Sequence, residues 1–261
     1  MIIDTHVHLD DDRYNDDLEF VLNNAIAHDV KQFIIPGADP KSLEKAIALS
    51  EKHEEIYFSV GVHPYDADNY DEAYLEQFIK HEKCVAVGEC GLDYFRLPDV
   101  LEEIAPYKAE QKEVFEAQIK LAIKYKLPLI VHVRDANQDS FDLLKKHEDA
   151  LVGGVLHCYN ASPLLLELSE KFYYGIGGVL TFKNAKNLVE ILPQIPQNRL
   201  LIETDAPYLT PTPHRGKRNE PAYTTFVAEK ISEVLNIPNE ELQNLTTKNC
   251  YTIFSKLLVA S

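Results

Sequence analysis

Short hydrophobic runs recur along the whole chain, and each is bounded by charged or turn-forming residues. Most are nearly continuous apolar strings, such as Leu129-Ile130-Val131, a pattern typical of parallel strands that are buried on both faces. These runs predict eight strands, over Ile2–Thr5, Lys31–Ile35, Ile56–Val60, Cys84–Gly88, Leu129–Val133, Val152–His157, Phe172–Ile176 and Leu200–Glu203.

Between the strands, apolar residues recur at the three- and four-residue spacing of amphipathic helices, as at Leu18, Val21 and Leu22. This spacing predicts helices over Asp17–Asp29, Pro40–His53, Glu110–Lys126, Asp139–His147, Pro163–Glu170, Asn187–Leu192, Tyr223–Leu235 and Glu240–Leu258. Strand and helix therefore alternate from one end of the chain to the other.

Eight strand–helix units of about 33 residues each predict an α/β fold, a single TIM-type (β/α)8 barrel. A doubly wound sheet is the alternative, but it would need a glycine-rich phosphate-binding turn after an early strand, and the sequence has none. Because no linker or low-complexity tract divides the chain, we expect residues 1–261 to form one domain.

The composition is that of an ordinary globular chain, with 45% hydrophobic and 26% charged residues among 261. These values exclude wholesale disorder and a collagen-like repeat. No run of about 18 apolar residues is present, so we expect no membrane span. The formal net charge of -16 argues against nonspecific adhesion to nucleic acids or anionic membranes, but it allows a local basic site.

The four cysteines (Cys84, Cys90, Cys158 and Cys250) form no CxxC pair and would make a sparse disulfide framework. Reduced thiols are therefore the expected state. The first residues have neither the basic segment nor the sustained apolar segment of a signal peptide. We expect a cytoplasmic protein with no membrane association, and the sequence indicates no obligate protein partner.

Residues that bind metals gather where the predicted strands end. His6 and His8 follow the first strand, His63 the third and Glu89 the fourth, while His132 lies in the fifth, His157 ends the sixth and Asp205 follows the eighth. In a barrel, the C-terminal strand ends and the loops after them build the active site. Residues two apart in a strand face the same way, so His6 and His8 would enter one cavity.

A single histidine is more often a satisfied core or surface residue, and this is our interpretation of His28, His53, His81 and His147. Five histidines and two carboxylates at corresponding places in six units are much harder to obtain by chance. The joint pattern therefore predicts a metal site.

Seven stretches carry a resemblance to a known family. They are Asp4-Thr5-His6-Val7-His8, Gly61-Val62-His63-Pro64, Gly88-Glu89-Cys90-Gly91-Leu92-Asp93-Tyr94, Pro128-Leu129-Ile130-Val131-His132-Val133-Arg134, His157-Cys158-Tyr159, Glu203-Thr204-Asp205-Ala206-Pro207-Tyr208-Leu209 and Arg215-Gly216-Lys217-Arg218-Asn219-Glu220-Pro221. In these motifs and their order, which spans nearly the whole chain, the sequence resembles the TatD-type metal-dependent hydrolases. The resemblance implies an amidohydrolase-like barrel with one or two divalent cations, which could be magnesium, manganese or zinc.

The resemblance also implies roles for the residues at the strand ends. His6, His8 and Asp205 would hold one metal, His132 and His157 would hold the other, and Glu89 would bridge both, with His63 placing substrate or water. The activities that it implies are hydrolysis of DNA, often from an end, and in some members deacylation of D-aminoacyl-tRNA.

Two segments depart from the family pattern, and we expect both to flank the cleft. Tyr159-Asn160-Ala161 stands where the family usually has an aromatic residue, then serine or threonine, then glycine. Leu97–Tyr107 is longer than the usual connection after Tyr94. The departures concern substrate preference more than metal chemistry.

Two neighbouring metal ions would lower the pKa of a shared water molecule and neutralise charge on a phosphoryl oxygen. Asp205 is the best candidate for the general base, because a carboxylate beside that water can take its proton. The alternative is that Asp205 is a structural acid that caps the following loop.

A nuclease with a strongly acidic total charge needs local positive groups. We expect Arg134, two residues after His132, and the loop residues Arg215, Lys217 and Arg218 to bind phosphate, with Lys183 and Lys186 as further candidates. The aromatic residues Tyr94, Phe95, Tyr159, Phe182 and Tyr208 could stack on unpaired bases. For Lys217 and Arg218, a solvated run of charge is the alternative. This small basic set favours single strands or ends over long duplexes.

The sequence supports three functional hypotheses. The first is a metal-dependent deoxyribonuclease, and the second is an ester or amide hydrolase acting on D-aminoacyl-tRNA or a small molecule. Lactonase and phosphotriesterase relatives bridge their metals with a carboxylated lysine, whereas this chain offers Glu89, which weakens the small-molecule alternative. A noncatalytic binding module is the third, and the intact ligand set with Asp205 argues against it.

Overall fold

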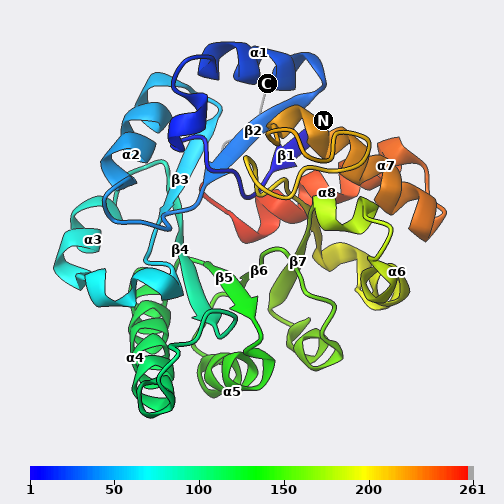
Figure 1. The fold of residues 1–261 in the computed structure, drawn as a ribbon. Helices are drawn as coiled ribbons and strands as arrows, with labels where there is room; N and C mark the ends of the chain where they lie inside the picture. Colours follow the sequence, from blue (N-terminus) through cyan, green and yellow to red (C-terminus); the bar gives the residue numbers. More distant parts are fainter. Residues whose placement is uncertain (258–261) are drawn as a thin grey trace.

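Eight parallel strands follow one another around a barrel in the order of the sequence in the computed structural model, which describes residues 1–257 (Figure 1). They are β1 (Ile2–Asp4), β2 (Val30–Ile35), β3 (Ile56–Val60), β4 (Cys84–Asp93), β5 (Leu129–Arg134), β6 (Gly154–Leu156), β7 (Phe172–Ile176) and β8 (Leu200–Ile202). Backbone hydrogen bonds from Thr5 N to Ile202 O (3.2 Å) and from Asp205 N to His6 O (2.9 Å) join the last strand to the first. The predicted (β/α)8 barrel is therefore confirmed.

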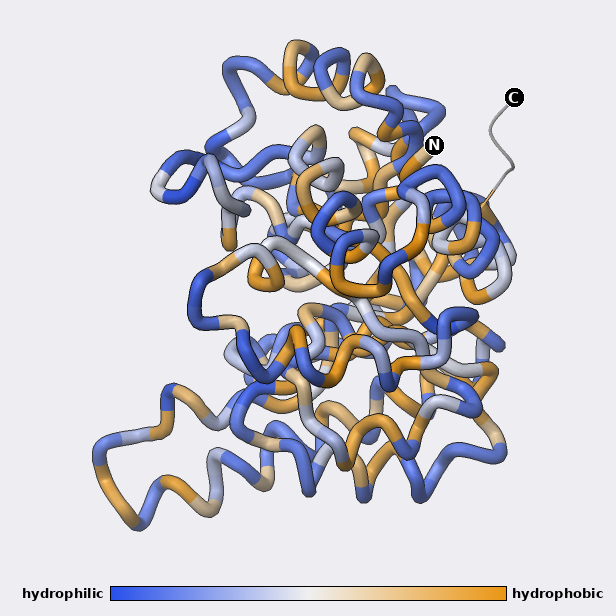
Figure 2. The backbone as a smooth tube through the Cα atoms, turned by 90° about the vertical axis from the view of Figure 1, so that its right-hand side faces the viewer, coloured by the Kyte–Doolittle hydropathy of each residue, from blue (hydrophilic) through white to orange (hydrophobic). Residues whose placement is uncertain are grey.

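Helices surround the barrel and cover its outer face (Figure 1). They are α1 (Leu18–Ala27), α2 (Leu43–Lys52), α3 (Glu72–Phe78), α4 (Leu101–Tyr125), α5 (Asn137–His147), α6 (Lys186–Ile191), α7 (Thr224–Leu235) and α8 (Asn239–Ile253). The backbone tube alternates between hydrophilic and hydrophobic stretches, as expected for helices with one apolar face (Figure 2). Within residues 1–257, no helix combines the length and apolar character that a membrane span requires.

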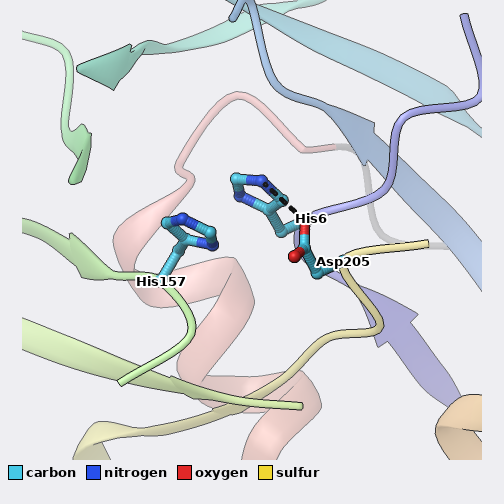
Figure 3. A group of neighbouring side chains, drawn as sticks. All are labelled: His6, His157 and Asp205. Atoms are coloured by element: carbon cyan, nitrogen blue, oxygen red, sulfur yellow. Dashed lines mark ion pairs between the residues drawn. The ribbon is translucent and has the colours of Figure 1, made fainter. Parts of the chain in front are cut away.

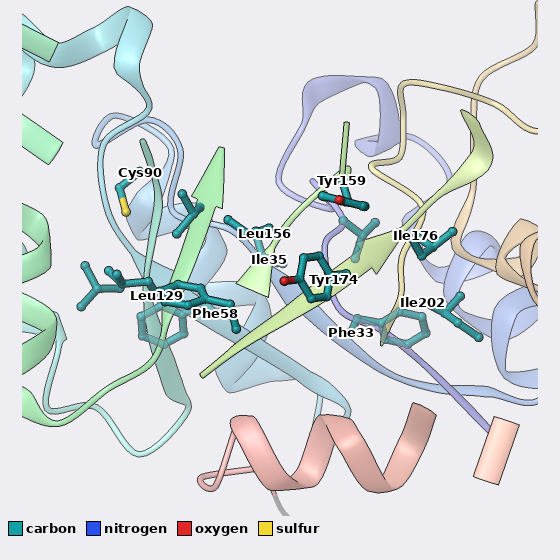
Figure 4. Packing of buried hydrophobic residues seen from close by; sticks show 14 of the residues in the cluster. Phe33, Ile35, Phe58, Cys90, Leu129, Leu156, Tyr159, Tyr174, Ile176 and Ile202 are labelled. Atoms are coloured by element: carbon teal, nitrogen blue, oxygen red, sulfur yellow. The ribbon is translucent and has the colours of Figure 1, made fainter. Parts of the chain in front are cut away.

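Successive strand residues pack into two different clusters, because side chains alternate across a sheet. Phe33, Phe58 and Leu129 belong to the large cluster beneath the surrounding helices, part of which is drawn in Figure 4. Their sequence neighbours Ile34 and Ile130 point to the opposite side, the inside of the barrel. The near-continuous apolar strings thus follow from burial on both faces.

Helix α8 closes one end of the barrel interior. Ile34, Ile130 and Leu201 share a buried cluster with Cys250 and Phe254, at the end of α8. This cluster fills the end of the barrel where the strands begin. The opposite end, where the strands finish, is the end at which the candidate site residues lie, and we call it the mouth.

Most predicted elements lie close to their observed positions, but four differ. Strand β4 extends to Asp93, so Glu89 lies within it and not after it. The predicted helix Pro163–Glu170 is a 3₁₀ helix, Pro163–Leu168, in the short connection between β6 and β7. Helix α3 was not predicted, although Asp71 caps its first turn by accepting from Tyr74 N.

The fourth difference concerns the connection after Tyr94. Leu97–Tyr107 is not a loop throughout, because helix α4 already begins at Leu101. The apolar spacing predicts a start only at Glu110, whereas the observed helix includes Pro106 in its second turn, where proline usually interrupts a helix. The last predicted helix, Glu240–Leu258, corresponds to α8, and Leu258 itself lies outside the described residues.

Candidate metal centre

The barrel brings all seven residues of the predicted metal site together at its mouth. His6 and His8 follow β1, His63 follows β3, Glu89 lies in β4, His132 lies in β5, His157 directly follows β6 and Asp205 follows β8. His132 shares a strand face with the inward residue Ile130, so alternation directs its ring toward the barrel axis. The residues are distant in sequence and meet only through the closure of the barrel.

One group of side chains gathers around Glu89 Oε2. This oxygen lies 3.2 Å from His6 Nε2 and 4.0 Å from His8 Nε2. Asp205 Oδ1 lies 3.7 Å from His6 Nε2 and 3.5 Å from His8 Nε2. Two imidazoles and two carboxylates therefore face one small volume.

A second group gathers around the other carboxylate oxygen. Glu89 Oε1 lies 2.9 Å from His157 Nε2, 3.0 Å from His132 Nδ1 and 3.7 Å from His63 Nε2. The two histidine nitrogens, His132 Nδ1 and His157 Nε2, are 3.1 Å apart. Glu89 thus lies between two sets of nitrogen and oxygen donors.

The donors are suited to a divalent cation. The rings of His6 and His157 stack with 3.9 Å between their centroids, and Asp205 lies beside His6 (Figure 3). His6 is fully buried, yet neither of its ring nitrogens has a hydrogen-bond partner among the described residues. A buried imidazole nitrogen rarely stays unsatisfied, and imidazole with carboxylate is a donor set that zinc and manganese accept. The residues present therefore fit a metal ion.

Two glycines shape β4 around Glu89. Gly88 and Gly91 have φ angles of +146° and +141°, which L side chains rarely adopt. A Cβ atom at Gly91 would lie 2.0 Å from His132 O, and one at Gly88 would lie 2.4 Å from Ile130 O. The glycines let β4 approach β5 closely, at the irregular register between Val87 and Cys90 where Glu89 enters the mouth.

Two acidic residues that the sequence analysis did not assign lie beside the histidines. Asp93 Oδ2 lies 2.8 Å from His132 Nε2, and Asp93 Oδ1 accepts from Tyr65 Oη at 2.8 Å. Glu203 Oε1 lies 3.6 Å from His157 Nδ1 and accepts from Cys158 N at 2.5 Å. Both acidic residues lie within the family motifs, and this position is the feature of the sequence that could have identified them as part of the site.

The surroundings set the protonation states of the site. Burial by itself would raise the pKa of the Glu89 carboxyl, but the charges of His157 and His6 and the hydrogen bonds of His132 and His157 hold that pKa well below its usual range. Burial lowers the pKa of His63 to about 4. Near neutral pH, Glu89 is therefore an anion and His63 is neutral.

Two arginines stand at the cavity that contains Glu89, and we call this space, about 360 Å³, the centre cavity. The guanidinium of Arg134 lies 3.6 Å from the ring centre of Phe95, and that of Arg96 lies 5.4 Å from the ring centre of Tyr65. Within residues 1–257, neither arginine forms an ion pair. Arg134 was expected at the site, whereas Arg96 was missed because it follows the Tyr94 motif in an irregular segment.

The other proposed substrate residues lie elsewhere. Arg218 bonds to Asp17 (2.7 and 2.9 Å) and to Glu220 (3.0 Å), so its guanidinium is already neutralised. Tyr94 is buried and donates to Asp139 Oδ2 at 2.7 Å, away from the centre cavity. Both side chains are therefore held in structural contacts, and a role for Arg218 and Tyr94 in substrate binding stays a prediction.

The remaining loop cations are less constrained than Arg218. Arg215 stacks 3.7 Å from the ring centre of Phe182 and donates to Thr210 O at 3.0 Å. Lys217 is exposed. Neither lines the centre cavity, so any contact that they make with substrate lies outside it.

The chain is similar to known proteins over nearly its whole length. Residues 3–255 match the model of the TatD related DNase family. The chain belongs to this family. The uncharacterized metal-dependent hydrolase YabD of Bacillus subtilis is 42% identical over 259 residues, which cover 97% of this chain and 99% of YabD. A TatD-family metal-dependent hydrolase is thus the general description of the protein.

Two further TatD-family relatives cover nearly the whole chain. The 3'-5' ssDNA/RNA exonuclease TatD of Salmonella typhimurium is 32% identical over 266 residues, with 97% of this chain and 98% of the relative covered. The crystal structure of YJJV, a TatD homolog from Escherichia coli K12, superposes with a TM-score of 0.86 at 30% identity, covering 97% of this chain and 98% of YJJV. The barrel is therefore the fold of the TatD family.

Proposed function

We propose that the protein is a divalent-metal-dependent deoxyribonuclease that removes nucleotides from the end of a single strand. The observation that carries the proposal is the Glu89 carboxylate, whose two oxygens face separate histidine groups at 2.9–3.2 Å. A pair of metal ions held in this way is a recurring arrangement for phosphodiester hydrolysis. The relative from Salmonella typhimurium, described as an exonuclease, supports the choice of substrate.

Membership of the TatD family suggests how these residues would divide between two cations. His6, His8 and Asp205 would hold one ion, His132 and His157 would hold the other, and Glu89 would contact both. When bound, the cations would supply charge neutralisation for the phosphate and a lowered pKa for water. His63, 3.7 Å from Glu89, stands beside these residues as a neutral hydrogen-bonding group for substrate or water.

Asp205 is the proposed general base. Its carboxylate lies at the mouth, forms part of the wall of the centre cavity and stays ionised near neutral pH, since His8 and His6 hold its pKa below the usual value despite burial. It can therefore take a proton from an attacking water. That water forms the new bond to phosphorus while the bond to the leaving oxygen breaks, and the leaving oxygen then takes up a proton.

Arg134 and Arg96 are the proposed phosphate-binding residues. Both border the centre cavity, and both stack on aromatic rings without carboxylate partners in the described part of the chain. An arginine held this way keeps its hydrogen-bond donors free for phosphate oxygens. This local charge offsets the repulsion between an acidic protein and a polyanion.

The test is hydrolysis of a labelled single-stranded oligonucleotide by metal-stripped protein, with magnesium, manganese and zinc restored separately. We expect metal-dependent release of terminal nucleotides. Asp205→Asn is expected to lower the rate by at least about 1,000-fold, because the base is lost. Titration of bound metal in the same preparation separates loss of the base from loss of the cation.

Two results would count against the proposal. Near-wild-type turnover by Asp205→Asn would remove Asp205 as the base. Absence of cleavage with every metal, together with release of D-tyrosine from charged tRNA, would keep the centre and replace the substrate by D-aminoacyl-tRNA.

A further inference from the structure

A second cavity adjoins the centre cavity, and we call it the apolar cavity. It has a volume of about 480 Å³, within the range of roughly 300–1,000 Å³ that is typical of small-molecule sites. His132, His157 and Asp205 form part of its wall, so it opens directly on the proposed metal ligands. The rest of the lining is largely apolar or aromatic and includes Val133, Tyr159, Val179, Leu188 and Leu209.

The lining offers few free groups that could read the edge of a nucleobase. The side-chain amide of Asn160 already donates to Asn137 Oδ1 (2.7 Å) and to Val133 O (3.3 Å). Its oxygen accepts from Ser162 N at 3.1 Å. The amide is therefore held in place and satisfied, so the cavity recognises shape and apolar surface more than hydrogen-bonding pattern.

Arg134 lines the apolar cavity as well as the centre cavity. A phosphate bound beside Arg134 and the proposed metal ligands therefore has the apolar cavity as its immediate neighbour. The group that a nucleic acid places one sugar away from its phosphate is a base, which has two apolar faces. Stacking and apolar contact with these faces tolerate any sequence.

We infer that the apolar cavity receives the base of the terminal nucleotide, next to the phosphodiester bond that is cleaved. The inference rests on the proposed nuclease function and deepens it. It favours digestion from an end, because only the terminal base lacks a neighbouring base on one side. It also predicts similar rates for the four bases.

The test compares substrates with and without a terminal base, and wild-type protein with a variant whose apolar cavity is narrower. One oligonucleotide carries an ordinary nucleotide at the digested end, and the other carries an abasic nucleotide there. We expect wild-type kcat/KM to be about tenfold or more higher with the base present. The variant Val179→Trp narrows the cavity and is expected to lower cleavage of the ordinary end to the abasic level, with the abasic end cleaved as before.

Val234→Trp is the matched control. Val179 and Val234 are both half-buried valines, but Val234 lies in α7 and lines neither the apolar cavity nor the centre cavity. The control variant should behave as wild type with both substrates. Equal cleavage of the ordinary and the abasic substrates by wild type would overturn the inference. An equal loss of kcat/KM on both substrates in Val179→Trp would also overturn it.

A second measurement needs no variant. Thymidine 5'-monophosphate should inhibit wild-type cleavage at about a tenfold lower concentration than deoxyribose 5-phosphate, and the other three nucleotides should resemble it. Equal inhibition by the sugar phosphate would contradict a base-binding cavity. Absence of nuclease activity with any metal would instead refute the proposed function, and the inference with it, whereas cleavage without a base effect refutes the inference alone.

Discussion

Asp93 fixes the ring of His132 through a 2.8 Å contact with Nε2, which leaves Nδ1 directed at Glu89. Carboxylates that orient ligating histidines usually change metal affinity or activity by about 10- to 100-fold when they are replaced. We expect Asp93→Asn to lower kcat/KM by this factor and to weaken metal binding in parallel, as measured by competition with a metal indicator. Asp142→Asn, at an exposed carboxylate that accepts from Gln138 in α5, is the control. Unchanged metal affinity in Asp93→Asn would show that Asp93 does not position His132.

Gly91 is a residue whose replacement is expected to destabilise the fold. Its φ of +141° and the 2.0 Å approach of a Cβ to His132 O combine backbone strain with overlap. We expect Gly91→Ala to lower the free energy of unfolding by about 2–5 kcal/mol. Gly216→Ala separates the two causes, because Gly216 has a φ of +83° but no atom within 4 Å of its Cβ position. Urea unfolding measures both, and an equal cost in the two variants would exclude the overlap as a cause.

At the level of elements, helix α4 holds two site-bearing segments through glutamines two turns apart. Gln118 accepts from Val62 N (2.8 Å) and donates to Val62 O (3.0 Å), next to His63. Gln111 makes the same pair of bonds with the backbone of Asp93 (2.9 and 3.1 Å). Both glutamines are buried, so α4 fixes the loop after β3 and the end of β4 through buried hydrogen bonds, and we call this arrangement the glutamine clamp.

We expect Gln118→Leu to lower the free energy of unfolding by about 2–4 kcal/mol, since it leaves the buried N–H and C=O of Val62 without partners. Activity should fall as well, because His63 follows Val62 directly. Gln138→Leu, on the exposed face of α5, should change stability by no more than about 0.5 kcal/mol. Denaturant melts of the two variants make the comparison, and equal small effects would contradict the glutamine clamp.

On the scale of the whole molecule, charge is unevenly distributed around the mouth. One hollow, which shares His8 and Tyr208 with the centre cavity, is bordered by four acidic residues, Asp10, Asp11, Asp12 and Asp39, and by two lysines, Lys41 and Lys45. Another hollow, of about 370 Å³ and on the side of α6, is bordered by three lysines, Lys183, Lys186 and Lys230, and by one acidic residue, Glu190. This asymmetry favours the passage of a polyanion over the α6 side.

The double variant Lys183→Glu/Lys186→Glu is therefore expected to raise the KM for single-stranded DNA. If each lysine contacts one phosphate, the slope of log affinity against log salt should fall by about 1.4. The double variant Lys41→Glu/Lys45→Glu is the control, since it changes the net charge by the same amount at two lysines that border the acidic hollow. Titrations of each variant with single-stranded DNA at several salt concentrations measure the affinity and its salt slope. Equal changes in the two variants would show that net charge, and not a path of the strand over the α6 side, determines the affinity.

The sequence by itself determined the barrel and the set of residues at its mouth. Seven strands lie within two residues of their predicted bounds, because burial on both faces requires apolar strings that local patterns reveal. The alternation of strands and helices then favoured a barrel, in which all the C-terminal strand ends lie at one mouth. His6, Glu89 and Asp205 are among the residues at these ends.

Only the tertiary structure decided which polar groups share a cavity. Arg218 has the sequence pattern of a phosphate-binding residue, but Asp17, distant along the chain, neutralises it. Asp93 gains its contact with His132, and the apolar cavity its walls, from strands and loops far apart in sequence. Local sequence encodes burial and propensity, whereas the pairing of charges and the shape of a cavity depend on distances that exist only after the barrel closes.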